Sequence, residues 1–297
     1  MIDKLKNIRP LYKGIVLIVL SAFFFALMNM FVQLSGNLPS LQKSFFRNFV
    51  AFLFAGIILV RDGERIQIPA NAVLPLILRA SFGTAGVLCN FYALGQLDLA
   101  DASILNKMSP FFAIIFSVIL LKEKIKPVQI IIVAAAFAGA MLVVKPSFAN
   151  ADSVPAFAGL FGGMCAGIAY TFVRMLGQRN VKGAVIVFFF SAFSCAVTLP
   201  FLIVGFVPMS WQQLIFLLLA GLSAAGGQFT ITAAYCHAPA REISVYDYSQ
   251  IIFAASLGFM VFGQIPDILS WAGYTIICSM AVIMFLYNKK KRALSEN

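Results

Sequence analysis

Ten long apolar segments, joined by short polar links, leave this chain few folds to adopt. Charged residues make up only 11% of the 297 residues, hydrophobic residues make up 61%, and the mean hydropathy is +0.94. Soluble domains carry roughly a quarter charged residues, so this composition excludes a soluble enzyme, a disordered chain and a secreted disulfide scaffold. Each segment approaches the ~20 apolar residues that cross a bilayer. The segments are 14–35, 41–60, 73–96, 102–121, 128–144, 155–177, 184–204, 211–235, 243–262 and 270–287.

The segments predict helices rather than strands. They are too long for buried core strands and show no two-residue alternation of apolar and polar side chains, which a membrane β-barrel requires. Helices satisfy their own backbone polar groups in lipid. We therefore predict an all-α integral membrane protein with ten transmembrane helices and no separate aqueous domain.

The net charge of +11 is distributed in a way that indicates orientation. With the N-terminus placed in the cytoplasm, sixteen of the 22 Lys and Arg residues fall in cytoplasmic segments and only Lys145 falls outside. This bias predicts a multi-pass protein of the cell (plasma or inner) membrane with both termini cytoplasmic. The basic excess is an orientation signal and not a nucleic-acid surface. The remaining five lie within the apolar segments: Lys43, Arg47, Arg79, Lys107 and Arg174.

The two halves of the chain show weak internal similarity. Several matches share a constant offset of 141 residues: Ala93 with Ala234, Ser103 with Ser244, Phe112 with Phe253, Asp101 with Glu242, Asn106 with Asp247, and Glu123 with Gln264. We predict one five-helix repeat in residues 1–150 and a second in 151–297. Five is an odd number, so the halves enter the membrane in opposite senses. Inverted repeats of this kind are typical of alternating-access transporters.

Short motifs in both halves resemble the EamA branch of the drug/metabolite transporter superfamily. The resemblance implies a 5+5 inverted fold and carriage of metabolites, but the branch carries varied substrates and the likeness names none. Gln264 stands where the family has a second acidic residue. The motifs are Phe45-Phe46-Arg47, Phe91-Tyr92-Ala93-Leu94, Ser109-Pro110-Phe111, Leu121-Lys122-Glu123-Lys124, Tyr246-Asp247-Tyr248-Ser249-Gln250 and Phe262-Gly263.

Polar residues inside the bilayer are costly, so each needs a partner, water or a function. In four segments they recur at helical spacing with small residues, as in the stripe Arg79, Gly83, Gly86 and Asn90. We interpret the glycines of segment 155–177 as close helix packing. We expect Lys43 and Arg79, near helix ends, to reach toward the interface. The predicted substrate-binding residues are Asn29, Asn90, Tyr92, Asn106, Lys107, Tyr170, Gln228, Tyr246, Asp247 and Gln250.

Four residues are candidates for gating or coupling: Arg174, Asp247, Pro110 and Arg47. Our hypothesis is that Arg174 and Asp247 pair and close the cytoplasmic side in one state. Arg174 could instead extend to the interface, and Asp247 could instead exchange a coupling proton. Pro110 removes a backbone hydrogen bond, so it could let its helix flex during switching.

Together these features predict a secondary-active transporter of a small amphipathic metabolite, such as an amino acid, a nucleoside or a derivative. Cations outnumber carboxylates in the expected cavity, which favours an anionic or zwitterionic substrate. The alternatives are a passive channel or facilitator and a flippase for a lipid-like molecule. No nucleotide-binding, zinc or nucleophile motif is present, so we expect no catalytic residue, metal or cofactor. The expected partners are the substrate and the lipid bilayer, with the chain as a monomer or a homodimer.

Overall fold

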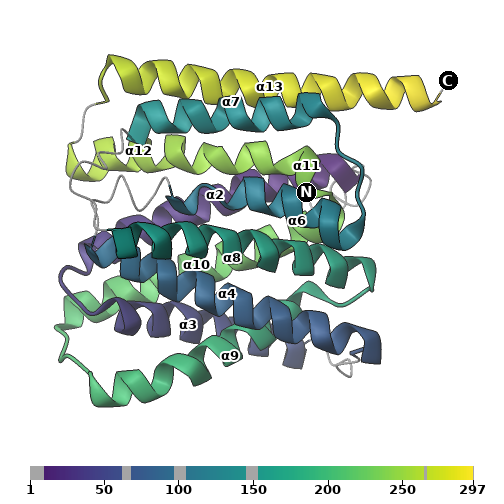
Figure 1. Ribbon diagram of the computed structural model, residues 1–297. Coiled ribbons are helices and arrows are strands. Elements are labelled where there is room, and N and C mark those ends of the chain that lie inside the picture. The colour runs from purple at the N-terminus through teal and green to yellow at the C-terminus, as the bar shows by residue number, and fades with distance from the viewer. Residues whose placement is uncertain (1–9, 62–67, 97–104, 145–152, 264–265, 297) are drawn as a thin grey trace.

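The computed structural model describes residues 10–61, 68–96, 105–144, 153–263 and 266–296, and these residues are almost entirely helical. Figure 1 shows the helices running side by side, with their connections gathered at two ends. The helices are α2 (Pro10–Leu34), α3 (Ser40–Arg61), α4 (Ala70–Gln96), α6 (Ser109–Leu121), α7 (Pro127–Val144), α8 (Ser153–Gln178), α9 (Gly183–Val204), α10 (Trp211–His237), α11 (Ala240–Ile243), η2 (Ser244–Tyr248), α12 (Ser249–Phe262) and α13 (Ile268–Glu296).

The predicted fold class is confirmed. Among the described residues, eight helical spans are long and apolar enough to cross a membrane, with α11 to α12 counted as one. Helices α6 and α7 are shorter and also apolar. Together they match the ten segments expected from the sequence, in the same order. The predicted boundary between the halves at residue 150 lies outside the described residues.

The ninth span departs from the continuous helix that its apolar run predicts. It begins as α11, tightens into the 3-10 helix η2, and continues as α12. The hydroxyl of Ser249 donates to the carbonyl of Tyr246 over 2.7 Å, at the junction of η2 and α12. Serine hydroxyls compete with the regular backbone pattern in this way. A 3-10 stretch inside a helix is often a hinge, so this span is divided where Asp247 lies.

The packing of helices is repeated between the two halves. Helix α2 packs on α10, and its counterpart α8 packs on α4; likewise α6 packs on α8, and α12 on α2. The counterparts α3 and α9 pack on each other, as do α7 and α13 at the edge of the bundle (Figure 1). Exchanging the first five spans for the second five therefore preserves these pairs, as a 5+5 inverted repeat requires.

Glycines of α8 allow this close approach. A Cβ on Gly167 would lie 2.5 Å from the Cβ of Phe112, and one on Gly163 would lie 2.6 Å from the carbonyl oxygen of Leu105. Small residues at such positions let two membrane helices pack backbone to backbone. The glycine stripe of α8 therefore serves packing, as interpreted from the sequence.

The two ends of the bundle differ in charge. We call the end with the links at 61–70, 121–127, 178–183 and 237–240 the basic end, because it carries Lys122, Lys124, Lys126, Arg179 and Lys182. The other end, called the opposite end, holds the links at 34–40, 204–211 and 262–268. In Figure 1 the basic end is on the right and the opposite end is on the left.

Candidate functional site

A large cavity lies between the two halves and extends to the opposite end. Its volume is about 1230 Å³, and its lining includes Asn37 in the link between α2 and α3, Ser40 at the start of α3, and Val207 in the link between α9 and α10. Eight predicted substrate-binding residues line it together with Arg47. They are Asn29, Asn90, Asn106, Lys107, Tyr170, Gln228, Asp247 and Gln250.

Lys107 and Asp247 form a buried ion pair in this cavity. The Nζ atom of Lys107 lies 2.9 Å from Oδ2 of Asp247 and donates to Oε1 of Gln250 over 2.7 Å. The hydroxyl of Tyr248 donates to the carbonyl of Lys107 over 3.1 Å. Lys107 precedes α6 and Asp247 lies in η2, so the pair joins equivalent spans of the two halves. Each charge neutralises the other, and both are less than 10% exposed.

Arg79 projects into the cavity from α4 and is only 2% exposed. Its Nη2 donates to Oε1 of Gln228 over 3.2 Å, and its guanidinium lies 4.1 Å from the ring centroid of Phe190, within the range of a cation–π contact. Gly83, one turn later, has no side chain where the guanidinium passes. Arg79 therefore does not extend to the interface as expected, because Gly83, Phe190 and Gln228 hold it inward.

Arg47 is the second buried guanidinium of the cavity. It is 7% exposed, and its carbon Cζ lies 6.0 Å from the ring centroid of Phe25. It forms no hydrogen bond or ion pair with any described residue, and its Nε is buried without a partner. Arg47, Arg79 and Tyr170 all line the same cavity. The ring of Tyr170 stacks on that of Tyr235 at 4.9 Å.

Two predicted tyrosines lie outside the cavity lining. Tyr92 is 48% exposed on α4. Tyr246 is buried in the apolar core, and its hydroxyl has no partner among the described residues. Neither residue lines the cavity in this structure, and a substrate-binding role for each stays a prediction. Register could not be fixed for Tyr246, since η2 interrupts the expected helix.

Pro110 also differs from its predicted role. It lies in the first turn of α6, where the backbone N–H groups have no intrahelical acceptor. Its ring therefore breaks no hydrogen bond in the helix interior, so the reason given for Pro110 to let this helix flex does not hold.

Arg174 and Asp247 do not pair in this structure. Asp247 binds Lys107, while Nε of Arg174 lies 3.5 Å from Oε1 of Glu123 and its Nη1 donates to the carbonyl of Cys236 over 3.0 Å. Arg174 lies one turn from the end of α8, nearer the basic end than Asp247. Arg174 and Asp247 therefore lie at different depths in the bundle, which separates the two charges that the sequence suggested as partners.

Glu123 is the acidic residue that the sequence interpretation missed. Its Oε2 also lies 3.4 Å from Nη1 of Arg241, so one carboxylate joins the cations of α8 and α11. Lys122 takes a left-handed φ of 54°, and the N–H groups of Lys122 and Glu123 both donate to the carbonyl of Ser117. This turn ends α6. We call Glu123, Arg174 and Arg241 the basic-end cluster. The motif Leu121-Lys122-Glu123-Lys124 is the sequence feature that could have indicated it.

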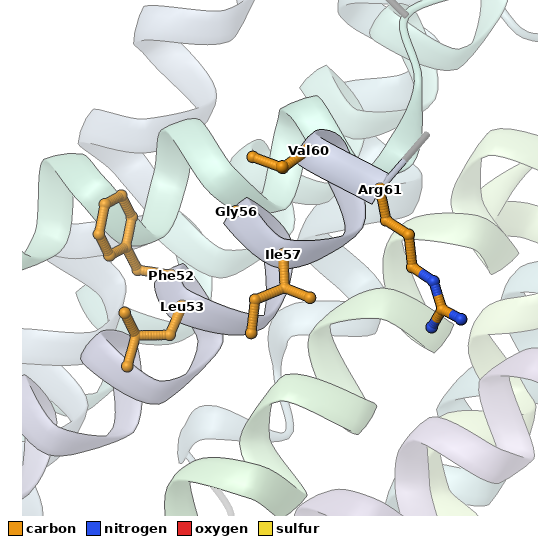
Figure 2. A pocket seen from close by; sticks show the side chains of 6 residues that line it. All are labelled: Phe52, Leu53, Gly56, Ile57, Val60 and Arg61. Carbon is orange, nitrogen blue, oxygen red and sulfur yellow. The ribbon is translucent and has the colours of Figure 1, made fainter. Parts of the chain in front are cut away.

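A second hollow lies on α3, near the basic end. It measures about 510 Å³ and is lined by Phe52, Leu53, Gly56, Ile57, Val60 and Arg61. Figure 2 shows these residues along one stretch of helix, with the guanidinium of Arg61 extending away from Phe52 and Leu53. Leu53, Ile57 and Val60 are exposed, as lipid-facing residues are. This hollow offers little polar chemistry, so the cavity between the halves is the candidate site.

Known proteins with similar sequences are transporters. The EamA-like transporter family matches residues 12–145. The chain is 34% identical over 269 residues to the pseudopaline exporter CntI of Pseudomonas aeruginosa, covering 90% of this chain and 94% of that protein. It is 28% identical over 268 residues to solute carrier family 35 member G1 of Mus musculus, covering 85% and 73%. It is 25% identical over 275 residues to a riboflavin transporter of Brucella anthropi, covering 88% and 94%.

The fold is also found among solved structures. One crystal structure matches with a TM-score of 0.82 and 13% identity, covering 95% of this chain and 99% of that one. This likeness concerns the fold alone. The sequence relatives point to a transporter rather than an enzyme, and the ten apolar helices make it a multi-pass membrane protein. By its similarity along nearly the whole chain, the protein belongs to the EamA branch of the drug/metabolite transporter superfamily.

Proposed function

We propose that this protein is a secondary-active transporter that moves a small amphipathic metabolite across the plasma (inner) membrane by alternating access. The observation that carries the proposal is a charged cavity between the two halves that reaches one end of the bundle only. Such a cavity can take a solute from one side while the other side is closed.

The charge asymmetry supports the orientation of this state. Cytoplasmic links are enriched in Lys and Arg, so we assign the basic end to the cytoplasm, and with it both termini. The cavity then faces the outer side. In the alternate conformation, the cavity opens at the basic end instead.

The basic-end cluster supplies the closure in this proposal. Glu123 joins Arg174 of α8 to Arg241 of α11, and Arg174 also binds the last turn of α10 through Cys236. Helix backbones are close here as well, since a Cβ on Gly177 would lie 2.7 Å from the Cα of Cys236. Opening this end requires breaking these contacts, which distinguishes a gated carrier from a continuous pore.

The relatives support metabolite-sized cargo. Pseudopaline and riboflavin, named for two of them, are both small organic molecules. The cavity combines cations, one carboxylate, amides and tyrosine, which suits an amino acid, a nucleoside or a derivative. We assign no lipid-sized substrate, because the polar lining suits a solute better than an acyl chain.

Reconstitution tests this proposal directly. Vesicles containing the protein are loaded with a defined mixture of amino acids, nucleosides and their carboxylated derivatives, and efflux is measured by mass spectrometry. A carrier gives saturable efflux that is accelerated by the same compound on the outside. Efflux that rises linearly with concentration, without such acceleration, indicates a channel; efflux equal to that of empty vesicles contradicts transport of these classes.

A further inference from the structure

We propose that Arg47 and Arg79 form a subsite for a dicarboxylate group of the substrate, so that the transported metabolite is an organic anion. The subsite rests on the proposed function, because it names the chemical group that the transport cavity binds.

The other charges of the cavity have partners within the protein. Lys107 is matched by Asp247 and also donates to Gln250. Lys43, at the mouth, is half-buried and donates to the carbonyl of Gly36 over 2.7 Å. Neither Arg47 nor Arg79 has an acidic partner among the described residues. Lys43 is partly open to water, whereas Arg47 and Arg79 are two buried positive charges without a carboxylate partner in the described part of the chain.

Arginine cannot relieve this cost by losing its proton, because its guanidinium stays charged in proteins. Burying a charge is expensive unless it is paired. At 7% and 2% exposure, Arg47 and Arg79 have little water around them. Their only described attractive contacts are the rings of Phe25 and Phe190 and one neutral amide, Gln228. None of the described residues neutralises these two charges.

Both side chains line the cavity. The Nε atom of each is buried and has no acceptor among the described residues. A guanidinium presents its N–H groups as a fork that matches the two oxygens of a carboxylate. Two such forks in the lining of one cavity are neutralised by a dianion. Gln228 comes from the second half of the chain, so a bound anion contacts groups of both halves.

The test uses glutarate as the dianionic probe, with its neutral isostere glutaramide and inorganic phosphate beside it. The thermal unfolding temperature of the purified protein in detergent is measured with each. We expect glutarate to raise this temperature and glutaramide to leave it unchanged. We expect the glutarate Kd to rise about ten- to hundredfold in Arg47→Gln and in Arg79→Gln, as for loss of a hydrogen bond to a charged group. Arg61→Gln, an exposed arginine on the same helix as Arg47, should retain the wild-type Kd.

Conservative variants keep the test decisive if a glutamine variant fails to fold. Arg47→Lys and Arg79→Lys preserve charge and lose the fork, so their Kd should lie between those of the wild type and the glutamine variants. A shift with phosphate alone, equal shifts with glutarate and glutaramide, or a glutarate shift that survives in both variants would overturn the subsite. Absence of any glutarate shift in the wild type would do the same. The vesicle efflux assay is independent, since transport of a neutral compound contradicts this subsite and leaves the carrier intact.

Discussion

At the scale of single residues, Gly83 shows how the absence of a side chain places a charge. A Cβ at this position would meet the guanidinium of Arg79 and lie 2.8 Å from the ring of Phe190. We expect Gly83→Ala to lower stability by about 1–3 kcal/mol, as overpacked sites do, and to weaken transport by displacing Arg79. Thermal unfolding in detergent and vesicle efflux measure the two effects.

Gly183→Ala is the matched control for that change. Gly183 begins α9, and a Cβ there would lie 3.7 Å from Cγ2 of Thr232, an ordinary contact. This variant should unfold at or slightly above the wild-type temperature. Equal unfolding temperatures for Gly83→Ala and the wild type would mean that Arg79 does not depend on the space at Gly83.

The Lys107–Asp247 pair predicts a non-additive result. Either Lys107→Met or Asp247→Asn leaves one buried charge without its partner, at a cost of about 3–5 kcal/mol. The double variant removes both charges, so we expect it to recover much of the stability lost in each single variant, while transport stays impaired. A double-mutant cycle on unfolding free energies measures this coupling. Strictly additive losses would show that the pair contributes nothing as a pair.

The residues that could be predicted from sequence are those whose position depends on one helix alone. Gly83, Gly86 and Asn90 line the cavity as their spacing indicates, whereas Arg79 was expected at the interface and lines the cavity too. The partners of these residues could not be predicted, because Phe190 and Gln228 come from helices over 100 residues away. The same reason explains the wrong pairing of Arg174 with Asp247. Opposite charges attract in many combinations, and only the packing of α6 against α8 brings Glu123 to Arg174.

At the scale of elements, the basic-end cluster ties the ends of α6, α8 and α11 together. Glu123→Gln removes the carboxylate that Arg174 and Arg241 share, so the two cations repel and this end should open more often. The thiol of Cys236 lies at that end, beside Gly177. In a chain lacking the other four cysteines, we expect several-fold faster labelling of Cys236 by a membrane-impermeant maleimide applied to the basic side of the membrane.

Asp267→Asn controls for loss of a carboxylate in general. Asp267 lies at the opposite end and accepts from the N–H and hydroxyl of Ser270, at the start of α13, a role that an asparagine side chain also fills. Its labelling rate at Cys236 should match that of the parent chain. If Glu123→Gln labels at this same rate, the cluster does not hold the end closed.

The element boundaries were predictable because apolar runs and turn residues are local. The unanticipated feature is the division of the ninth span into α11, η2 and α12, since its apolar run continues across the 3-10 turn. Nothing in the run itself shows that Ser249 bonds the backbone of Tyr246.

At the scale of the whole molecule, the distribution of basic residues predicts which end faces the cytoplasm. We expect a single cysteine at Asn37 to be labelled by an impermeant maleimide added to intact cells, and one at Lys124 to be labelled only after the cells are opened. Both positions are exposed, so accessibility within the protein does not separate them. The reverse pattern would invert the orientation and the direction in which the cavity faces.

The ion pair between Lys107 and Asp247 has a kinetic consequence. Lys107 lies in the turn that precedes α6, and Asp247 lies in the 3-10 turn that precedes α12. These turns are equivalent in the two halves, so one ion pair connects them. A substrate that competes for either charge breaks the pair and releases both turns in a single event. Part of the substrate's binding energy is then used to break this ion pair. We therefore expect such a carrier to bind its substrate weakly and to transport it rapidly.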